Sequence, residues 1–454
     1  MRLDDARCAA YDLLYEVGAE DAYANLVMPQ IIAHYELRGR DAAFATELAF
    51  GTLRLRGLLD AVLSRCVDRE LARIEPPVLD VLRLGAYQLL AMRVPSHAAV
   101  ATSVDLARRA TRNNASGLVN TVLRKVAARD RDAWEALVAE GADDLTALSV
   151  VHSHPAWEVR ALGDALGASR GELPQLLAVD NTPPSVTLVA RPGASTIEEL
   201  LDAAPGEPGR WSPYAVRMRA GAPGAIHAVV EGRAAVQDEG SQLVALALAT
   251  AEVVGEDDRW LDLCAGPGGK AGLLAALVAQ RGGALTAVEI QPHRADLIRR
   301  TLRGVPGSHR VVVADGTTFS GTFDRVLVDA PCTGLGVLRR RPESRWRREP
   351  GDVAALAPLQ RSLLRNAIAC TRPGGVIAYA TCSPHLAETD LVVEDVLRDG
   401  TVDRLDAREI TLAVPGLHDV EGFRAHTDPG PALRLWPHRH DTDGMYLSLL
   451  RRRA

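Results

Sequence analysis

Two patterns of apolar and polar positions divide the chain. Up to about residue 145, apolar residues recur every three or four positions, as Val78, Val81, Leu82 and Leu89 do. This spacing places them on one face of an α-helix. The proline pair just before Val78 suits a helix start. The pattern predicts an all-α bundle of short helices over residues 1 to 145.

After residue 257 the pattern changes to short apolar runs that alternate with helical segments. We expect strands at residues 260 to 264, 284 to 290, 310 to 314, 323 to 329 and 375 to 380, and helices at 270 to 280, 292 to 302 and 352 to 370. Alternation of this kind is typical of an α/β domain with a doubly wound, Rossmann-like parallel sheet.

The stretch between these two parts favours neither pattern. Residues 181 to 225 contain seven prolines and five glycines, which is too many for continuous helices. Short strands, for example at 185 to 189, and a helix at 197 to 203 remain compatible with it. We therefore predict a multidomain protein with a helical domain at 1 to 145, a linker and small α+β subdomain at 146 to 235, and an α/β domain at 236 to 454.

Composition narrows the classes of function. The net charge of −6 argues against a wholly basic nucleic-acid binder, although local basic patches remain compatible with it. No signal peptide or bilayer-spanning apolar run is present, so we expect a soluble, cytoplasmic protein. The six cysteines include no C-x-x-C pair, which suggests neither a disulfide framework nor a zinc site. No metal is expected.

Glycines and acids gather where the predicted strands end. The segment Leu-Asp-Leu-Cys-Ala-Gly-Pro-Gly-Gly-Lys at 261 to 270 joins the first strand to its helix, and it matches neither the dinucleotide fingerprint nor a Walker loop. Acidic residues lie at the ends of four strands, at Asp262, Glu289, Asp315 and Asp329. Strand ends of a parallel sheet meet at one crevice. A crevice rich in carboxylates suits a cationic nucleoside such as S-adenosylmethionine.

Two cysteines follow neighbouring predicted strands. Cys332 lies in Asp-Ala-Pro-Cys-Thr-Gly at 329 to 334, where proline and glycine favour a turn, and Cys382 ends the strand at 375 to 380. If the two strands are neighbours in the sheet, their ends are only about 5 Å apart, and both thiols would then face the same crevice. Considered without its neighbours, the motif around Cys332 indicates that this cysteine is the nucleophile. Cys8, Cys66 and Cys370 are expected to be buried filler.

Three basic segments are candidates for contacts with nucleic acid. Residues 338 to 348 hold six arginines with Trp346 among them, and residues 434 to 440 read Arg-Leu-Trp-Pro-His-Arg-His. Such segments can bind phosphates and stack on unpaired bases, or form solvated surfaces. The third candidate is a late cluster in the helical part, at Arg108, Arg109, Arg112, Arg124, Lys125, Arg129 and Arg131.

The helical part resembles the NusB-like RNA-binding domain. The resemblance is carried by Arg54-Leu-Arg56, by Leu-Gly-Ala-Tyr-Gln-Leu-Leu at 84 to 90 and by Val-Asn-Thr-Val-Leu-Arg at 119 to 124. The α/β part resembles the RNA cytosine-C5 methyltransferases in its segments 261 to 270, 329 to 334, 380 to 383 and 434 to 440. The two resemblances together imply an enzyme that methylates small-subunit ribosomal RNA, and we expect a monomer.

The resemblance also implies roles for individual residues. It implies that Cys382 is the nucleophile that attacks C6 of cytosine, that Cys332 assists product release, and that Asp329 contacts both cofactor and base. The implied S-adenosylmethionine site consists of Cys264, Ala265, Gly266, Pro267, Gly268, Gly269, Lys270, Glu289, Arg294, Asp315 and Asp329.

Three other readings remain open. A transfer RNA could be the substrate of the same cytosine-C5 chemistry. A DNA cytosine methyltransferase would use Cys332 as its nucleophile, but the NusB-like half and the second cysteine disfavour it. A non-catalytic RNA-binding antitermination or assembly factor is disfavoured by the intact glycine loop, both thiols and all four acids.

Overall fold

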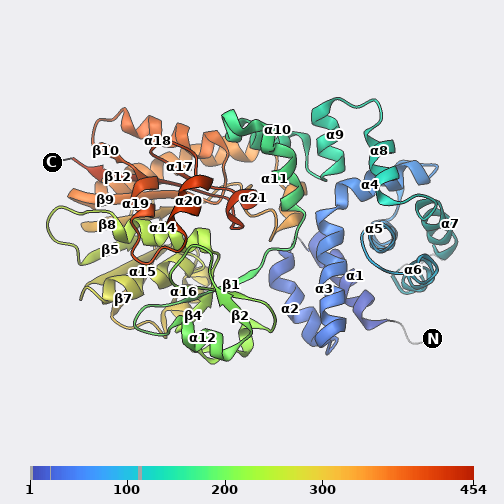
Figure 1. The fold of residues 1–454 in the computed structure, drawn as a ribbon, viewed down its shortest axis with the longest axis horizontal. Helices are drawn as coiled ribbons and strands as arrows, with labels where there is room; N and C mark the ends of the chain where they lie inside the picture. The colour runs from blue at the N-terminus through green and yellow to red at the C-terminus, as the bar shows by residue number, and fades with distance from the viewer. Residues whose placement is uncertain (1–3, 21, 111–114, 454) are drawn as a thin grey trace. The chain divides into compact units, whose positions relative to one another are not determined.

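The computed structural model describes residues 4–20, 22–110 and 115–453. The chain forms two compact units, of which the first comprises the residues up to Pro183 together with Leu338–Arg348. The second comprises Pro184–Val337 and the residues from Glu349 onward (Figure 1). The predicted boundaries at 145 and 235 remain a prediction, because compact units need not coincide with inherited domains.

The first unit is all α-helical, as the apolar spacing predicts. Acidic N-caps begin several helices: the side chain of Asp4 accepts hydrogen bonds from the backbone of Ala6 and Arg7, and Asp130 accepts one from Ala133. The helices are α1 (Asp5–Ala19), α2 (Ala24–His34), α3 (Gly39–Arg54), α4 (Arg56–Cys66), α5 (Pro76–Leu90), α6 (Ser96–Ala110), α7 (Ser116–Val126), α8 (Arg131–Ala139), α9 (Asp144–Val151), α10 (Ala156–Leu166) and α11 (Leu173–Asp180).

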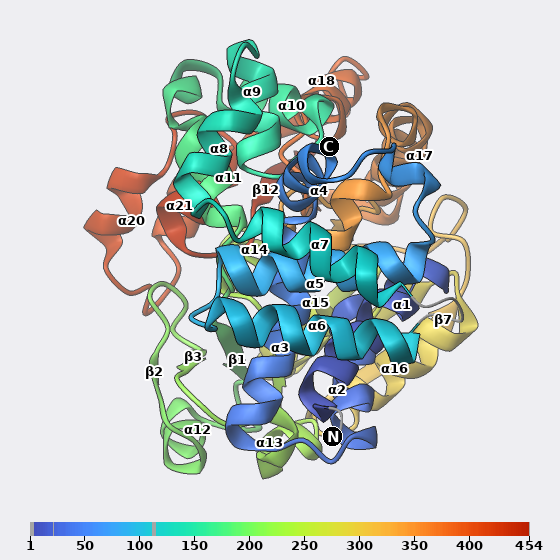
Figure 2. The same ribbon diagram turned by 90° about the vertical axis from the view of Figure 1, so that its right-hand side faces the viewer.

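The core of the first unit forms where the predicted apolar stripes meet. Helices α5, α6 and α7 lie side by side (Figure 2), and they bury Val81, Leu82 and Leu123 together. Cys8 and Cys66 are also buried there, which confirms that they are core filler. Helices α9 to α11 belong to this unit, so the helical part extends beyond the bundle expected at residues 1 to 145.

A segment from the second half of the chain completes the first unit. Arg345 is fully buried, and its guanidinium donates hydrogen bonds to the carbonyl oxygens of Arg54 at 2.9 Å and Asp180 at 2.8 Å, and to Asn181 Oδ1 at 2.7 Å. Trp346 packs closely against Gly57. The prediction of an RNA contact is therefore wrong for Arg345, whereas a contact through the partly buried Trp346 stays a prediction. A buried arginine whose guanidinium donates to carbonyl oxygens in this way stabilises the fold.

The late basic cluster of the first unit is largely engaged within the protein. Lys125 donates to the carbonyl oxygen of Cys66 at 2.9 Å, Arg131 pairs with Glu135 at 2.6 Å, and the Arg129 guanidinium lies over the Trp134 ring. Arg112 lies outside the described residues. A phosphate-binding face made of the remaining cluster stays a prediction.

The second unit begins with a small antiparallel sheet. Its strands are β1 (Val186–Ala190), β2 (Gly206–Pro208), β3 (Ala215–Met218) and β4 (Ala234–Val236), in the order β2-β3-β1-β4. Helix α12 (Ile197–Ala203) coincides with the predicted helix, and α13 (His227–Val230) precedes β4. The proline-rich stretch therefore forms a small sheet of short strands. Isolated prolines are tolerated there because they lie at strand edges and turns.

The large sheet of the second unit carries the site. Its order is β10-β12-β9-β8-β5-β6-β7, with β11 paired to β12. Strands β5 to β9 are parallel to their neighbours, whereas β12 is antiparallel to β9 and β10. The strands are β5 (Arg259–Asp262), β6 (Ala284–Glu289), β7 (Ser308–Val313), β8 (Phe323–Asp329), β9 (Thr371–Thr381), β10 (Val402–Leu405), β11 (Leu433–Leu435) and β12 (Met445–Arg452).

Helices cover both faces of this sheet, as a doubly wound fold requires (Figure 1). One face packs against α14 (Glu239–Thr250), α15 (Gly269–Ala279), α16 (Pro292–Leu302) and α19 (Ala407–Leu412), and the other against α17 (Pro350–Cys370) and α18 (Asp390–Leu397). Two short helices, α20 (Val420–His426) and α21 (Pro437–His440), lie near the end of the chain. The parallel strands therefore run buried on both sides, which explains their continuous apolar sequences.

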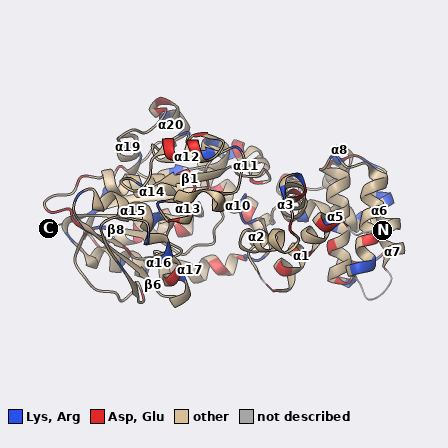
Figure 3. Cartoon of the chain, turned by 90° about the horizontal axis from the view of Figure 1, so that it is seen from below, with Lys and Arg blue, Asp and Glu red and all other residues tan. Residues whose placement is uncertain are grey.

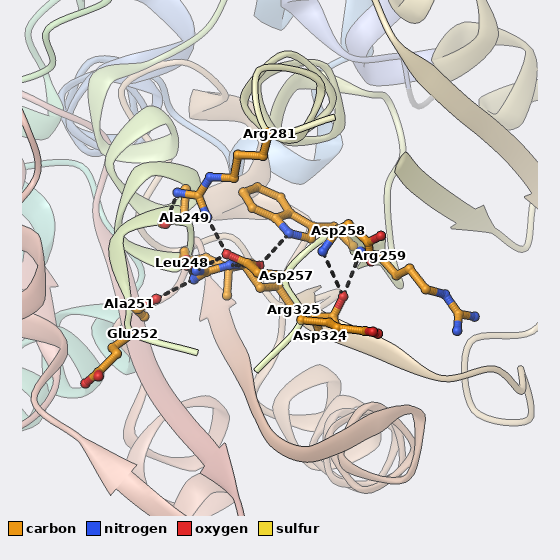
Figure 4. A network of polar contacts seen from close by, with 12 residues as sticks. Leu248, Ala249, Ala251, Glu252, Asp257, Asp258, Arg259, Arg281, Asp324 and Arg325 are labelled. Carbon is orange, nitrogen blue, oxygen red and sulfur yellow. Dashed lines mark hydrogen bonds and ion pairs between the residues drawn. The ribbon is translucent and has the colours of Figure 1, made fainter. Parts of the chain in front are cut away.

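At the end of the sheet where the parallel strands begin, buried ions are fully paired. Arg325 is 3% exposed and forms two hydrogen bonds with the carboxylate of Asp257, at 2.6 and 2.7 Å (Figure 4). The Asp324 carboxylate accepts hydrogen bonds from the backbone of Asp258 and Arg259. This network ties the start of β8 to the loop that precedes β5.

Candidate active site

The strand order reverses between β5 and β8, and this reversal creates a crevice at their carboxyl ends. From β5 the chain continues to β6 on one side, whereas β8 lies on the other side. Ligands of doubly wound folds bind outside such a switch point. Asp262 ends β5 and Asp329 ends β8, so the topology places both predicted acids there.

The glycine loop is held by the acid at the end of β6. Glu289 is 4% exposed, and its Oε2 accepts a hydrogen bond from the backbone nitrogen of Gly266 at 3.1 Å. A Cβ at Gly266 would lie 2.1 Å from that oxygen, so only glycine fits at this position. Arg294 donates to the carbonyl oxygen of Gly266 at 2.6 Å. Gly268 has a φ of 115°, which favours glycine at the start of α15.

The single lysine of the second unit pairs with the acid that ends β8. Lys270 Nζ lies 2.8 Å from Asp329 Oδ2, and both side chains are largely buried. Burial alone would lower the pKa of Lys270, but the charge and the hydrogen bond of Asp329 leave it raised. Lys270 is therefore a fixed, compact cation beside the crevice.

Asp262 is a buried acid whose oxygens have no hydrogen-bond partner of normal geometry. Burial raises its pKa to about 8, and the neighbouring charge of Asp329 adds to the shift. A buried polar group without partners is expensive, so such groups favour a ligand that supplies them. The orphaned carboxyl group favours a ligand in the crevice that forms hydrogen bonds with it, or whose positive charge lowers its pKa again.

Asp315 follows β7 and is exposed. Its Oδ1 accepts hydrogen bonds from the backbone nitrogen and the hydroxyl of Thr317, both at 2.8 Å, and these bonds lower its pKa. The side chain therefore shapes its own turn and remains ionised at neutral pH. A carboxylate oxygen can accept further hydrogen bonds, so the turn leaves capacity for a ligand.

The two predicted reactive cysteines meet at the same edge. Strands β8 and β9 are parallel neighbours, with Asp329 opposite Ala380, and the Sγ atoms of Cys332 and Cys382 lie 3.4 Å apart. This confirms that both thiols face one place. The hydrogen bond with Cys382 and burial raise the pKa of the Cys332 thiol well above its usual value. None of the six cysteines, all of which lie in the described part of the chain, forms a disulfide.

Cys264 differs from this pair although it lies in the glycine loop. Burial raises the pKa of its thiol far above the usual range, and the acids Asp262 and Asp329 add to the effect. A thiol that resists ionisation is a poor nucleophile. Cys264 therefore suits a packing or backbone-binding role. Cys370 is buried at the end of α17, as expected.

Beneath the two thiols lies a fully buried glutamate that sequence reasoning missed. Glu388 follows Cys382 by six residues, and its carboxylate accepts hydrogen bonds from Thr333, Ser383 and Gln360. No local motif marks it, because acids are common after a strand. Its only sequence signal is an acid shortly after the second cysteine, which does not separate a buried group from a surface one.

The segment 434 to 440 is structural where base contacts were predicted. Trp436 and His440 are each 1% exposed, and Arg439 pairs with Asp428 at 2.6 Å. Burial lowers the pKa of His440 to about 3, so the ring is neutral at physiological pH. The prediction of base contacts is wrong for the two buried rings. The His440 ring instead lies edge-on to the Trp211 ring, and Trp436 Nε1 donates to Asp428 Oδ2 at 3.2 Å.

Charge is mixed over both units, as Figure 3 shows. Among the described residues, no cluster of three or more metal-ligating side chains occurs, and no helix is long and apolar enough to cross a bilayer.

Comparison with known families identifies both halves of the chain. Residues 249–451 match the family of 16S rRNA methyltransferases RsmB/F, and residues 4–128 match the NusB family. The NusB match confirms the predicted resemblance of the helical part. The first match covers the large sheet with its glycine loop and both thiols.

Relatives extend the match to the whole chain. A Mycobacterium tuberculosis protein named only as a methyltransferase is 53% identical over 452 residues, which cover 99% of this chain and 97% of the relative. The ribosomal RNA small subunit methyltransferase B of Klebsiella pneumoniae is 31% identical over 458 residues, 98% of each chain.

Solved structures agree on the fold. The crystal structure of PH0851 superposes with a TM-score of 0.80 at 20% identity and covers 100% of this chain and 99% of its own. The structure of NSun6 from Pyrococcus horikoshii with SFG has a TM-score of 0.54 at 18% identity and covers 65% of this chain and 97% of its own.

Proposed function

Because the chain belongs to the family of 16S rRNA methyltransferases RsmB/F, we propose that it methylates C5 of a cytosine in small-subunit ribosomal RNA through a covalent bond to Cys382. The observation that carries this proposal is the pair of thiols at the switch-point edge, 3.4 Å apart and beside the Asp329–Lys270 ion pair. Two adjacent free thiols at a strand edge suit a reaction in which one cysteine attacks and the other assists.

The methyl donor of the family is S-adenosylmethionine, which supplies an electrophilic methyl group on a sulfonium when bound. The residues of the crevice suit it, since the orphaned carboxyl of Asp262 and the acids Glu289, Asp315 and Asp329 favour a cation. We assign its binding to residues 264 to 270 together with Glu289, Arg294, Asp315 and Asp329. The backbone of the glycine loop would approach the ligand where side chains cannot.

Cys382 begins the reaction by adding to the cytosine. Cytosine C5 is too weak a nucleophile to take a methyl group unaided, so the Cys382 thiolate forms a bond to C6 and moves electron density to C5. The Cys332 thiol lies within hydrogen-bond distance of the Cys382 sulfur, at 3.4 Å, and can donate to it. That hydrogen bond favours the thiolate on Cys382 rather than on Cys332.

Asp329 and Lys270 prepare the base for attack. A hydrogen bond between Asp329 and the N3 edge of the ring would stabilise the negative charge that develops there, if the carboxyl carries a proton or a bridging donor. Lys270 Nζ contacts Asp329 and supplies compensating positive charge. Preorganised donors of this kind are worth most where charge develops.

Release of the product reverses the first step. A base or a water molecule takes up the C5 proton, the electron pair of the C5–H bond reforms the C5–C6 double bond, and the C6–S bond breaks to expel the Cys382 thiolate. Cys332 lies beside the departing sulfur and assists this stage. An enzyme that reaches C6 needs an unstacked base, so we expect a cytosine in a loop or one that is flipped out.

We propose ribosomal rather than transfer RNA as the substrate because of the family to which the chain belongs, and not because of a contact in the structure. Bisulfite sequencing of ribosomal and transfer RNA from a strain that lacks this gene tests it. We expect one cytosine of small-subunit ribosomal RNA to lose its methylation. A loss of methylation confined to transfer RNA would show that transfer RNA is the substrate. Unchanged methylation of both RNAs would favour a non-catalytic factor. A cytoplasmic location and a monomeric state remain predictions.

The covalent step has its own test. With the methyl donor and RNA present, Cys332→Ala should accumulate a protein–RNA adduct on denaturing gels, because release is impaired while attack proceeds. Cys382→Ala should form no adduct and show no turnover. Cys370→Ala is the matched control, because that thiol is buried away from the pair. The reverse pattern of adducts would exchange the roles of the two cysteines.

A further inference from the structure

We propose that Glu388 is a positioning residue, which holds the loop after β8 and the loop after β9 so that Cys332 and Cys382 act as a pair. The role in catalysis rests on the proposed function, whereas the role in placing the thiols does not. Glu388 itself touches neither sulfur and is not expected to touch the substrate.

The carboxylate of Glu388 is a convergence point for four hydrogen bonds. Oε1 accepts from the backbone nitrogen of Thr333 at 2.8 Å and from Gln360 Nε2 at 3.2 Å. Oε2 accepts from the hydroxyls of Thr333 and Ser383, both at 2.6 Å. The side chain is fully buried. Hydrogen bonds to a buried carboxylate are short and strong, so this cluster is rigid.

The partners of the carboxylate are the immediate neighbours of the two thiols. Thr333 follows Cys332, and Ser383 follows Cys382, so the two oxygens of one side chain bridge the two loops. The hydroxyls of Thr333 and Ser383 also lie 3.1 Å apart. A shift of either residue would move the adjoining sulfur, because only one peptide unit separates them.

Further contacts fix Glu388 against the sheet. The hydroxyl of Tyr379, on β9, donates to the carbonyl oxygen of Glu388 at 2.7 Å. Gln360 Nε2 on α17 donates both to Glu388 and to the carbonyl oxygen of Pro331 at 2.8 Å. Glu388 and its hydrogen-bond partners Thr333, Gln360 and Ser383, here called the clamp, therefore link β9, α17 and both cysteine loops. Movement of one loop without the other would break several hydrogen bonds.

Stability alone is a weak reason to keep this group. Among the described residues, the contacts of the Glu388 carboxylate are neutral donors, with no lysine or arginine within ion-pair distance. Burying a carboxylate without a cation is costly, and apolar residues of similar size often stabilise a core as well or better. The geometry that the clamp imposes on the thiols explains why a carboxylate lies here.

Glu239 is the matched control for a merely structural role. It is also buried in the second unit, and its carboxylate accepts hydrogen bonds from the backbone nitrogens of Arg210, Trp211 and Ser212. None of its partners adjoins a cysteine. Glu239→Ala therefore reports what the loss of a buried, hydrogen-bonded carboxylate does to the fold.

The first test measures the distance between the thiols without any RNA. Diamide oxidises two thiols to a disulfide and is itself reduced to the hydrazine, taking up both hydrogens. In the full-length protein, Cys332 and Cys382 should be linked rapidly, as detected by mass spectrometry of peptides. Glu388→Ala should slow this linkage at least about tenfold, since effective concentration falls steeply when orientation is lost. Glu239→Ala should not slow it.

The second test separates turnover from binding. Glu388→Ala should lower kcat about 100-fold, the scale expected for a misplacement of about 1 Å, with KM for RNA and for S-adenosylmethionine little changed. Glu388→Gln should recover most of the loss. Its carbonyl oxygen can accept from Thr333, and its amide can donate to hydroxyls that rotate to accept.

The outcomes are distinct. Equal linkage rates for Glu388→Ala and Glu239→Ala would overturn the positioning role, and so would a change confined to KM. If Glu388→Ala does not fold, Thr333→Val and Ser383→Ala remove one arm each and should slow the linkage in the same way. A wild type that links its thiols rapidly yet methylates no cytosine would contradict the proposed function and leave the positioning role supported.

Discussion

The two ends of strand β8 use buried charge in opposite ways. Where the strand begins, Arg325 and Asp257 form two hydrogen bonds, and Arg325 also donates to the carbonyl oxygen of Ala251 at 2.6 Å (Figure 4). Where it ends, Asp262 lies close by with neither oxygen satisfied, and the thiols of Cys332 and Cys382 share one hydrogen bond. The strand therefore runs from a completed network to an edge where Asp329 pairs with Lys270 but the acid of the neighbouring strand, Asp262, lacks partners.

The difference indicates which end is built for stability and which for chemistry. Paired and hydrogen-bonded ions hold a sheet edge in one geometry, and removing one partner leaves the other charge buried alone. Unsatisfied acids and thiols with raised pKa values stabilise nothing, and such groups cluster where a ligand or reaction completes them. The comparison predicts that substitutions at the two ends separate activity from stability.

The largest effect is expected from Asp329→Asn at the carboxyl end. The amide keeps an acceptor for Lys270 but loses the negative charge, so we expect kcat to fall by about 100-fold or more, the scale of a polar group positioned where charge develops. The melting temperature should also fall somewhat, because Lys270 keeps a hydrogen bond but loses the charge of its partner. Steady-state turnover with circular dichroism of the same samples checks both. A large loss of folded protein at unchanged kcat would remove the distinction between the two ends.

A loss of stability is expected from Arg325→Met at the opposite end. The substitution leaves Asp257 without its main partner, and breaking a buried ion pair in this way costs about 3–5 kcal/mol of unfolding free energy. Hydrogen exchange of β5 and β8, followed by mass spectrometry, should show faster exchange. The kcat of the folded fraction should be unchanged.

Arg281→Met is the control for that substitution. Arg281 contacts the same carboxylate, but its side chain is 40% exposed, so its removal should cost no more than about 1 kcal/mol. If both arginine variants exchange alike, burial is not what makes the Arg325 pair important.

An effect smaller than that of Arg325→Met concerns Asp262 and depends on pH. Its pKa is about 8 in the folded protein and about 3.9 in an unfolded chain, so the folded state holds a proton that the unfolded state releases between these values. Wild-type stability from this group is complete below about pH 4 and is lost as pH rises through 8. Asp262→Asn cannot titrate, so without a ligand its stability relative to wild type should rise by about 1–3 kcal/mol from pH 5 to pH 9.

Thermal unfolding at the two pH values measures this difference. A stability gap between Asp262→Asn and wild type that is constant with pH would show that Asp262 is already ionised in the folded protein. The carboxyl end of β8 would then hold an ionised acid, as its start does, and the contrast between the two ends would weaken.

Most of the sheet could be predicted because its signals are local. Apolar runs bounded by glycines and acids marked strands that the structure places almost where expected, with β8 at Phe323–Asp329 as predicted. The antiparallel strand β12 was not predicted, although it pairs Tyr446 with Thr381 next to Cys382. Pairing between residues so far apart in the chain leaves no periodic trace in the sequence.

The sequence by itself determined that the acids and thiols follow parallel strands. The apolar run of each strand, the helix that follows it and the acid or thiol at its end are all consecutive in the chain. Only the tertiary structure decided which charges are buried. Arg345 has the sequence signature of a surface cation, yet its donors are used by carbonyl oxygens of the first unit. Glu388 resembles any acid after a strand, yet it joins the two cysteine loops. A polar side chain can face solvent, bind a ligand or stabilise the fold. Which of these it does depends on partners that are distant in the sequence, and no local sequence pattern encodes those partners.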